Sequence, residues 1–441
     1  MSNNQPLIKF NPKLPKVSSN EKAVLKLLVE AGKLIAPIYL EQENQLKQNG
    51  SFYPKGVSKA EVEKSAKKDP EILSPYTVIE KVDGKLKAIP YHVKYAHLLK
   101  PVADKLNEAA RITQNKSFGT YLKLKAKALQ DGSYEEAVKF WFKMKPYILD
   151  ISIGPVEHHD DQLFYNKASY QAWVGVVDNE GTKQLNYYKK IVLSTRRKAL
   201  LPDELLENYT KVRAKVDDLI LFSGHMARSK FVGVVLPADL ESIEKYGSSI
   251  TLFNQANDLR LKEQILPTFN KIFSPAFRKG FSFADLKKGS FNYIALHELA
   301  HNDLYYKNAA KNLQDLLSPI YELSATVLGM RMAGSLLLKD IITNKELESI
   351  IVVFICRGFY LLEKSKTSNW ANYAAGGAIF INFMLQSGAL KQLKGLAIPN
   401  FTKIFVSIQD LSYALEFLLS SGTRKNAEDF IKKYGQFNHI P

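Results

Sequence analysis

The sequence predicts an α+β protein that is predominantly helical. Apolar residues recur at the 3.6-residue helical spacing in segments throughout the 441-residue chain, and most regularly after residue 256. Two stretches rich in β-branched and aromatic residues, 76–91 and 148–193, indicate strands in the first part of the chain. We therefore expect a mixed α+β lobe over residues 1–255 and a helical lobe over residues 256–441.

The first 146 residues combine helices with one hairpin. Over residues 21–46 apolar side chains recur at helical spacing, and Pro37 predicts a kink. Ser58 is typical of an N-cap and precedes a short charged helix. Asp83-Gly84 separates two short β-rich runs, which predicts a tight hairpin turn. Three amphipathic helices should follow, over residues 92–112, 118–131 and 133–146.

The middle of the chain has mixed patterns. Residues 148–193 predict a small sheet, and residues 202–222 favour a helix. Residues 231–236 (FVGVVL) are typical of a buried strand. Asn254 begins a polar stretch that should cap a helix starting near Leu259. Further helices are expected over residues 345–364, 370–386 and 405–419.

The charge balance bears on the class of partner. The chain has 61 Lys and Arg against 44 Asp and Glu, a formal net charge of +17. Such a charge suggests a nucleic acid or an anionic membrane as a possible partner. The basic residues are spread along the chain, and the densest clusters, 64–68 and 123–127, lack interleaved aromatic residues. This favours a solvated lysine-rich surface, and we expect no nucleic-acid partner.

The compartment is indicated by three features. A single cysteine, Cys356, excludes an internal disulfide, and its apolar neighbours predict a buried thiol in a reducing compartment. The first residues lack the apolar segment of a secretory signal. No run approaches the ~18 apolar residues of a membrane span. We expect a cytoplasmic protein without a membrane partner, and the sequence does not predict its oligomeric state.

The most specific motif is H-E-x-x-H, formed by His297, Glu298 and His301. Residues four apart lie on one face of a helix, so the two imidazoles can bind one metal ion while Glu298 points toward its water. Apolar neighbours such as Ile294 and Leu299 fit a buried helix. The alternative is a pair of hydrogen-bonded core histidines, and the motif favours a single zinc ion.

Zinc would need a third protein ligand. Glu322 lies twenty-one residues after His301 and opens a second apolar run, which Ser318 and Pro319 should start as N-cap and first-turn residues. A loop would let the two helices pack antiparallel, so that Glu322 faces the histidines. Asp315 is the competing carboxylate, in a polar loop nearer to His301.

Several stretches together resemble the dipeptidyl peptidase III family of zinc peptidases, in its shorter, Nudix-associated and bacterial branch. They are residues 153–157, 161–168 and 172–175, Asn254–Glu263, HELAH, Glu322–Thr326 and 382–389. This resemblance implies two lobes around a wide cleft, with zinc on the helical lobe and peptide bound by the mixed lobe. It further implies cleavage near the free N-terminus of a peptide, releasing dipeptides.

The resemblance also implies roles for individual residues. His297, His301 and Glu322 would bind zinc, and Glu298 would be the general base. Glu157 matches the acidic residue that holds the substrate's free α-amino group.

Two further positions follow from the same resemblance. Asn254 lies in a matching stretch and is expected to bind substrate. Tyr373 stands where the family would have a His that stabilises the oxyanion, and either this Tyr or His225 could donate that hydrogen bond. The replacement of His by Tyr leaves open an alternative, a catalytically weak or inactive zinc- and peptide-binding protein.

Overall fold

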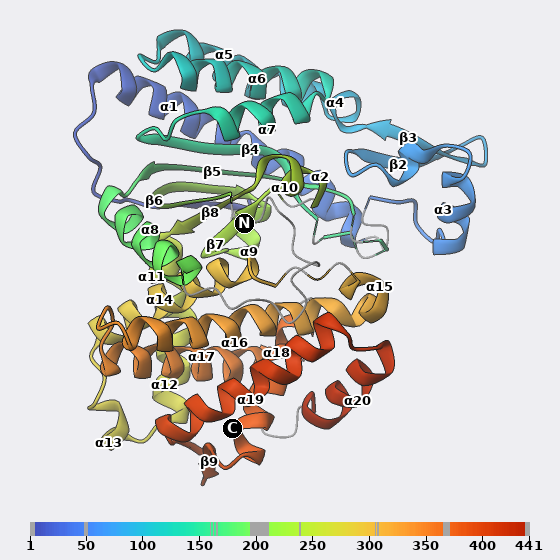
Figure 1. Ribbon diagram of the computed structural model, residues 1–441. Coiled ribbons are helices and arrows are strands. Elements are labelled where there is room, and N and C mark those ends of the chain that lie inside the picture. The colour runs from blue at the N-terminus through green and yellow to red at the C-terminus, as the bar shows by residue number, and fades with distance from the viewer. Residues whose placement is uncertain are drawn as a thin grey trace. The chain divides into compact units, whose positions relative to one another are not determined.

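The computed structural model describes most of the chain. The described residues are 5–47, 52–158, 160–161, 163–164, 166–194, 211–237, 240–304, 306, 308–364 and 371–436. They form helices, which predominate, together with one larger sheet and two hairpins (Figure 1). The predicted α+β class is confirmed. No described helix is long and apolar enough to cross a membrane.

The chain forms two compact units that interleave in sequence. Unit 1 comprises Met1–Asp178, Asp217–Phe231 and Leu236–Tyr246. Unit 2 comprises Asn179–Val216, Val232–Val235 and Gly247–Pro441. The predicted division into lobes at residue 255 stays a prediction.

The N-terminal helices and hairpin of unit 1 follow the sequence pattern. The helix predicted over residues 21–46 is divided at Leu34, three residues before Pro37, whose missing N–H and ring disfavour a continuous helix. Ser58 caps its helix by accepting a hydrogen bond from the Glu61 N–H. The elements are α1 (Ser19–Lys33), α2 (Ile35–Lys47), α3 (Lys59–Ala66), β2 (Thr77–Val82), β3 (Lys85–Pro90), α4 (Tyr91–Lys94), α5 (Ala96–Ile112), α6 (Lys116–Asp131) and α7 (Tyr134–Lys143).

The sheet of unit 1 brings three strand ends together. Strand β4 (Leu149–Glu157) pairs antiparallel with β5 (Ser169–Val177), and β5 pairs antiparallel with β6 (Val212–Gly224). The short β1 (Leu7–Lys9) pairs with the other edge of β6. Glu157 lies opposite Ser169, and Gln171 lies opposite Gly224. The end of β4, the start of β5 and the end of β6 therefore adjoin.

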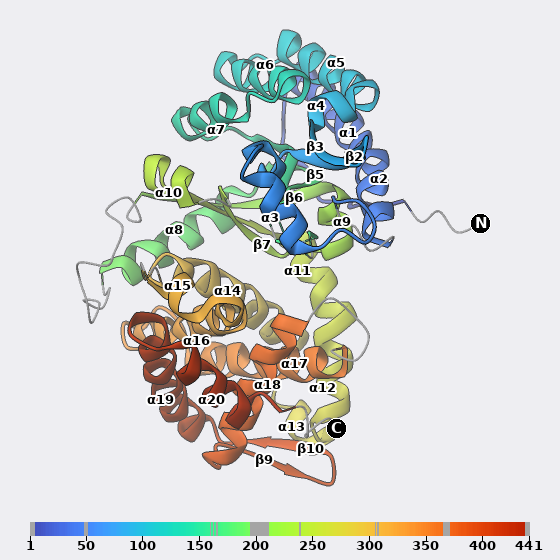
Figure 2. The same ribbon diagram turned by 90° about the vertical axis from the view of Figure 1, so that its right-hand side faces the viewer.

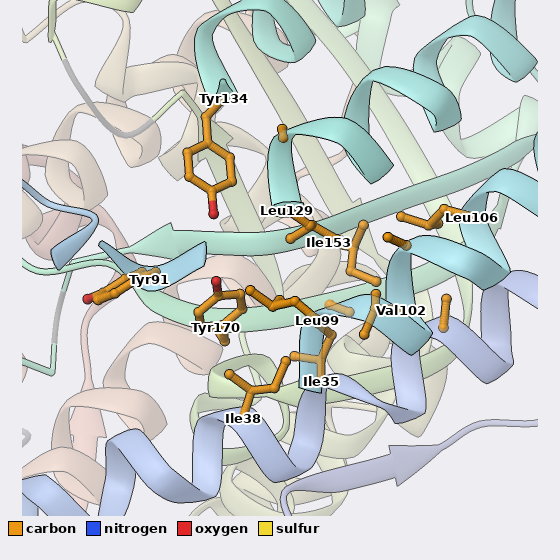
Figure 3. Close-up of a cluster of buried hydrophobic side chains, with 14 of the residues drawn as sticks. Ile35, Ile38, Tyr91, Leu99, Val102, Leu106, Leu129, Tyr134, Ile153 and Tyr170 are labelled. Atoms are coloured by element: carbon orange, nitrogen blue, oxygen red, sulfur yellow. The ribbon is translucent and has the colours of Figure 1, made fainter. Parts of the chain in front are cut away.

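The core of unit 1 lies between this sheet and its helices. Leu99, Val102 and Leu106 are fully buried on one face of α5 and belong to the same cluster as Ile153 of β4. Figure 3 shows them gathered with Tyr134 and Tyr170, whose hydroxyls point toward one another. Each buried Leu or Val contributes roughly 1.5–3 kcal/mol relative to an exposed position. This packing holds β4 firmly.

Unit 2 is mainly helical. Helix α14 packs against α16 and α17, and α17 packs against α18. The β9–β10 hairpin and the last two helices complete the unit (Figure 2). Its main elements are α8 (Asn179–Ser194), β8 (Ser248–Phe253), α11 (Asn254–Arg260), α12 (Leu266–Ile272), α13 (Pro275–Arg278), α14 (Phe283–His301), α15 (Ala309–Leu313), α16 (Leu317–Leu337), α17 (Asn344–Lys364), α18 (Ala371–Gln386), β9 (Leu390–Leu393), β10 (Leu396–Pro399), α19 (Phe401–Ser420) and α20 (Arg424–Tyr434).

The structure corrects two predictions in the middle of the chain. Residues 212–222, expected to be helical, form most of β6, because buried Val212, Ala214 and Val216 alternate with less buried side chains at the period of a strand. Residues 202–210 of that predicted helix lie outside the described residues, and Lys211 is not helical. The predicted sheet over residues 148–193 ends at Val177, and α8 follows it.

The structure confirms one further predicted strand and shifts the starts of two predicted helices. Strand β7 (Gly233–Leu236) lies within the predicted FVGVVL strand. Helix α11 begins at Asn254 itself, without a side-chain cap. Helix α16 begins at Leu317, so Ser318 is its second residue and the predicted N-cap role is wrong.

Candidate metal centre

The H-E-x-x-H motif forms the last turn of α14. This helix starts with a capping box, in which Ser282 accepts from the Asp285 N–H and Asp285 accepts from the Ser282 N–H. Its C-terminal end is fixed by Asn302, which accepts a 2.7 Å hydrogen bond from Ser248 of β8 and donates to the Glu298 carbonyl. The helix therefore presents its last turn in one defined orientation.

Helix α16 brings the third predicted ligand to the two histidines. It approaches α14 closely because Gly329 faces the backbone of α14. A Cβ at this position would lie 2.9 Å from the carbonyl carbon of Leu296 and 3.0 Å from the His297 nitrogen. Glu322 lies two turns earlier on α16.

The ligand atoms of His297, His301 and Glu322 all lie within 4.8 Å of one another. The two Nε2 atoms are 3.2 Å apart, and Glu322 Oε2 lies 3.5 Å from His297 Nε2 and 3.9 Å from His301 Nε2. Ligands at about 2.05 Å from a tetrahedral zinc ion lie about 3.3 Å apart. The spacing of this donor set therefore fits one zinc ion with a fourth position free for water.

Hydrogen bonds orient the imidazoles. Thr326 Oγ1 lies 3.0 Å from His297 Nδ1, which leaves Nε2 to face Glu322. The ring of Tyr321 lies 5.1 Å from the ring of His301, and its hydroxyl donates to the His301 carbonyl at 3.4 Å. Thr326 and Tyr321 were not predicted from the sequence. Tyr321 directly precedes Glu322 on α16, and Thr326 lies one helical turn after it.

The pKa values of the two histidines are shifted in opposite directions. Burial lowers the pKa of His301 to about 4, against the opposing charge of Glu322. Burial also disfavours the charged form of His297, but its hydrogen bond to Glu322 and the charges of Glu298 and Glu322 outweigh this effect and raise its pKa. A neutral imidazole is the form that binds a metal ion, so the lowered pKa keeps His301 in a form that could bind one at neutral pH.

The carboxylate of Glu298 is buried against strand β7. A Cβ on Gly233 would lie 2.8 Å from Glu298 Oε1 and 3.0 Å from its Cγ. Only a glycine leaves space for the carboxylate in this position. Sequence reasoning missed Gly233, although an isolated glycine inside a strand pattern is itself an indication of close approach.

The other predicted site residues are placed as follows. Glu157 is buried at the end of β4 in unit 1, and Asn254 is half-buried at the start of α11 in unit 2. The backbone of Tyr373 belongs to α18, but its side chain lies outside the described part of the structure. Asp315, the competing carboxylate, pairs with Arg424 instead. His225 is hydrogen bonded within unit 1 through both ring nitrogens.

Comparison with solved structures identifies the architecture. Dipeptidyl peptidase III from Caldithrix abyssi matches with a TM-score of 0.83 and 22% identity, over 95% of this chain and 91% of that chain. The enzyme of the same name from Corallococcus sp. strain EGB gives 0.80 and 22%, over 97% and 90%. The chain has the dipeptidyl peptidase III fold. The predicted resemblance is confirmed at the level of this fold.

Comparison with curated sequences gives a third similar protein. Nudix hydrolase 3 of Arabidopsis thaliana is 24% identical over 362 residues, which are 79% of this chain and 46% of that protein. The chain thus spans about half the length of this relative. No protein-family model matches the chain. The dipeptidyl peptidase III fold therefore rests on the structural comparison.

Proposed function

We propose that this protein is a zinc-dependent peptidase that removes dipeptides from the free N-terminus of peptides. The observation that carries the proposal is the convergence of His297, His301 and Glu322 within 4.8 Å. The named activity of both structural relatives supports the same reaction class. Under this proposal residues 1–255 bind the peptide, residues 256–441 carry the catalytic centre, and the protein acts in the cytoplasm.

The residues of the proposed centre have separate chemical roles. Zinc, when bound by His297, His301 and Glu322, supplies a Lewis acid and lowers the pKa of water to ~7. Glu298 takes the proton from the attacking water and passes it to the nitrogen of the departing amine. Its burial against Gly233 holds the carboxylate in one place for both transfers.

Substrate recognition is proposed for residues outside the metal centre. Glu157 would bind the α-amino group of the peptide through its negative charge, and this contact would select peptides with free N-termini. Asn254 would hydrogen bond the peptide backbone. The Tyr373 hydroxyl would donate to the developing oxyanion.

The test is mass spectrometry of a peptide library in which half of the peptides have acetylated N-termini. Zinc-loaded wild type should release dipeptides only from free N-termini, and Glu298→Ala should retain zinc but release none. Asp315→Asn is the matched control and should cleave normally, because Asp315 pairs with Arg424. Cleavage by Glu298→Ala at the wild-type rate would refute the mechanism.

A second candidate function is a zinc- and peptide-binding protein with little or no turnover. The Tyr at position 373, in place of the expected His, favours it. It predicts intact peptides in every reaction, together with measurable zinc and peptide binding by calorimetry.

A further inference from the structure

A second group of reactive side chains lies in unit 1, outside the cluster of His297, His301 and Glu322 in unit 2. His225 Nδ1 lies 2.8 Å from Asp160 Oδ2, and His225 Nε2 lies 3.0 Å from Ser229 Oγ. The carboxylate and the hydroxyl thus bond opposite nitrogens of one imidazole. A nucleophile, a base within hydrogen-bond reach of it and an acid that orients the base form the pattern of nucleophilic acyl transfer.

The topology of the sheet brings these residues together. Asp160 follows β4, while His225 and Ser229 begin and end α9 (His225–Ser229), which directly follows β6. The ends of β4 and β6 adjoin at the start of β5, as described above. His225 and Ser229 are four residues apart, so they lie on one face of this short helix. The arrangement therefore combines two segments that are remote in sequence.

The orienting acid is held as a carboxylate. Asp160 Oδ2 also accepts hydrogen bonds from Ser169 Oγ at 2.7 Å and from the Tyr39 hydroxyl at 3.1 Å. Burial opposes ionisation of Asp160, but the charge and hydrogen bond of His225 and these two hydroxyls outweigh it and lower its pKa. An ionised Asp160 favours the tautomer of His225 with its proton on Nδ1. In the neutral imidazole with this tautomer, Nε2 carries no proton and can accept that of Ser229.

The imidazole is buried, whereas Ser229 is partly exposed. The side chain of His225 is 4% exposed. The rings of Tyr39 and Phe231 lie 5.9 Å and 5.5 Å from it. Ser229 is half-buried at the C-terminal end of α9, so part of this residue lies at the protein surface. An ion pair of 2.9 Å between Arg228 and Glu43 anchors α9 to α2.

We propose that Ser229 is the nucleophile of a second, zinc-independent site that accepts acyl groups from small esters, with His225 as its base and Asp160 as a positioning residue. Ser229 Oγ attacks the carbonyl carbon while its proton moves to His225 Nε2. The ester C–O bond breaks, and His225 returns the proton to the departing alcohol. Water then attacks the acyl-serine by the same route, which releases the acid and restores Ser229.

The test is covalent labelling by a fluorophosphonate probe, which loses fluoride on reaction with an activated serine. The full chain is treated with EDTA and then with the probe, and the modified peptide is identified by mass spectrometry. We expect the adduct on Ser229, with no adduct in Ser229→Ala. Ser65→Ala is the matched control, because Ser65 is also helical and half-buried in the same unit. An unlabelled Ser229, or unchanged labelling of Ser229→Ala, would overturn the proposal.

The roles of the partners are tested by rates. His225→Gln should lower the labelling rate at least ~100-fold, as expected for loss of a general base. Asp160→Asn should also lower the rate, and Asp160→Glu should restore part of it. A labelling rate in His225→Gln equal to that of wild type would refute the assigned base.

A second variant keeps the proposal testable if His225→Gln fails to fold. In Ser229→Cys the new thiol would pair with His225, and such pairing lowers a thiol pKa. Cys356 is buried with a raised pKa, so the background reaction is slow. Iodoacetamide should alkylate Ser229→Cys at pH 7 at least ~10-fold faster than free cysteine. A rate equal to that of free cysteine would overturn the proposal.

Discussion

Gly233→Ala should disable the proposed general base without removing the metal. The added Cβ would lie 2.8 Å from Glu298 Oε1 and 2.9 Å from Leu252 Cδ2. Ordinary contacts begin near 3.4 Å, so the carboxylate must move by about 0.6 Å. A displacement of about 1 Å can lower a rate ~100-fold. We therefore expect kcat to fall roughly 10- to 100-fold, or about 1.4–2.7 kcal/mol in the activation free energy.

The assay is steady-state cleavage of a peptide with a free N-terminus, together with zinc content by mass spectrometry. Zinc content and KM should match wild type, because none of the three metal ligands is displaced. Gly376→Ala is the control in the same unit, since a Cβ there would make ordinary contacts of 3.5 Å and 3.6 Å. Wild-type kcat in Gly233→Ala would refute the view that β7 positions Glu298.

Three further predictions concern other parts of the chain. Thr326→Val removes the partner of His297 Nδ1 and should weaken zinc binding ~10- to 100-fold, measured by competition with a chromophoric chelator. Tyr373→Phe should lower kcat ~100-fold or more with little change in KM if its hydroxyl supports the oxyanion, and unchanged kcat would remove that role. Burial lowers the pKa of Lys125 to about 8 from 10.5, so the unfolded chain binds more protons between these values. The free energy of unfolding, measured by urea titration, should therefore rise between pH 8 and pH 10.5, and it should rise less steeply in Lys125→Met. The same pH dependence in wild type and variant would contradict this prediction.

Local patterns allowed much of the structure to be predicted. The helices with clear 3.6-residue spacing and the Asp83-Gly84 hairpin depend on neighbours in sequence. Both residues of that turn have positive φ, 50° and 75°. The pairing of His297 with His301 is also local, since it needs only one helical turn. Glu322 was predicted as the third ligand because few carboxylates lay at a suitable distance along the chain, and its closeness to both histidines agrees with that prediction.

Contacts between residues that are far apart in the sequence could not be predicted in the same way. Gly233 contacts Glu298 from a strand 65 residues earlier in the chain, and nothing near H-E-x-x-H indicates it. The β6 strand was hidden because Asp217 and Asp218 interrupt its alternation of apolar and polar residues. Its pairing with β5 outweighs that local preference, as tertiary context does for strands in general.

The interleaving of the two units has a consequence for how the chain can be divided. The backbone passes from one unit to the other after residues 178, 216, 231, 235 and 246. Strand β6 itself is shared, with residues 212–216 in unit 2 and the remainder in unit 1. Neither unit is therefore a continuous segment that a protease could release with a single cut. During synthesis, unit 1 is completed only after residue 246, so more than half of the chain must emerge before either unit can close.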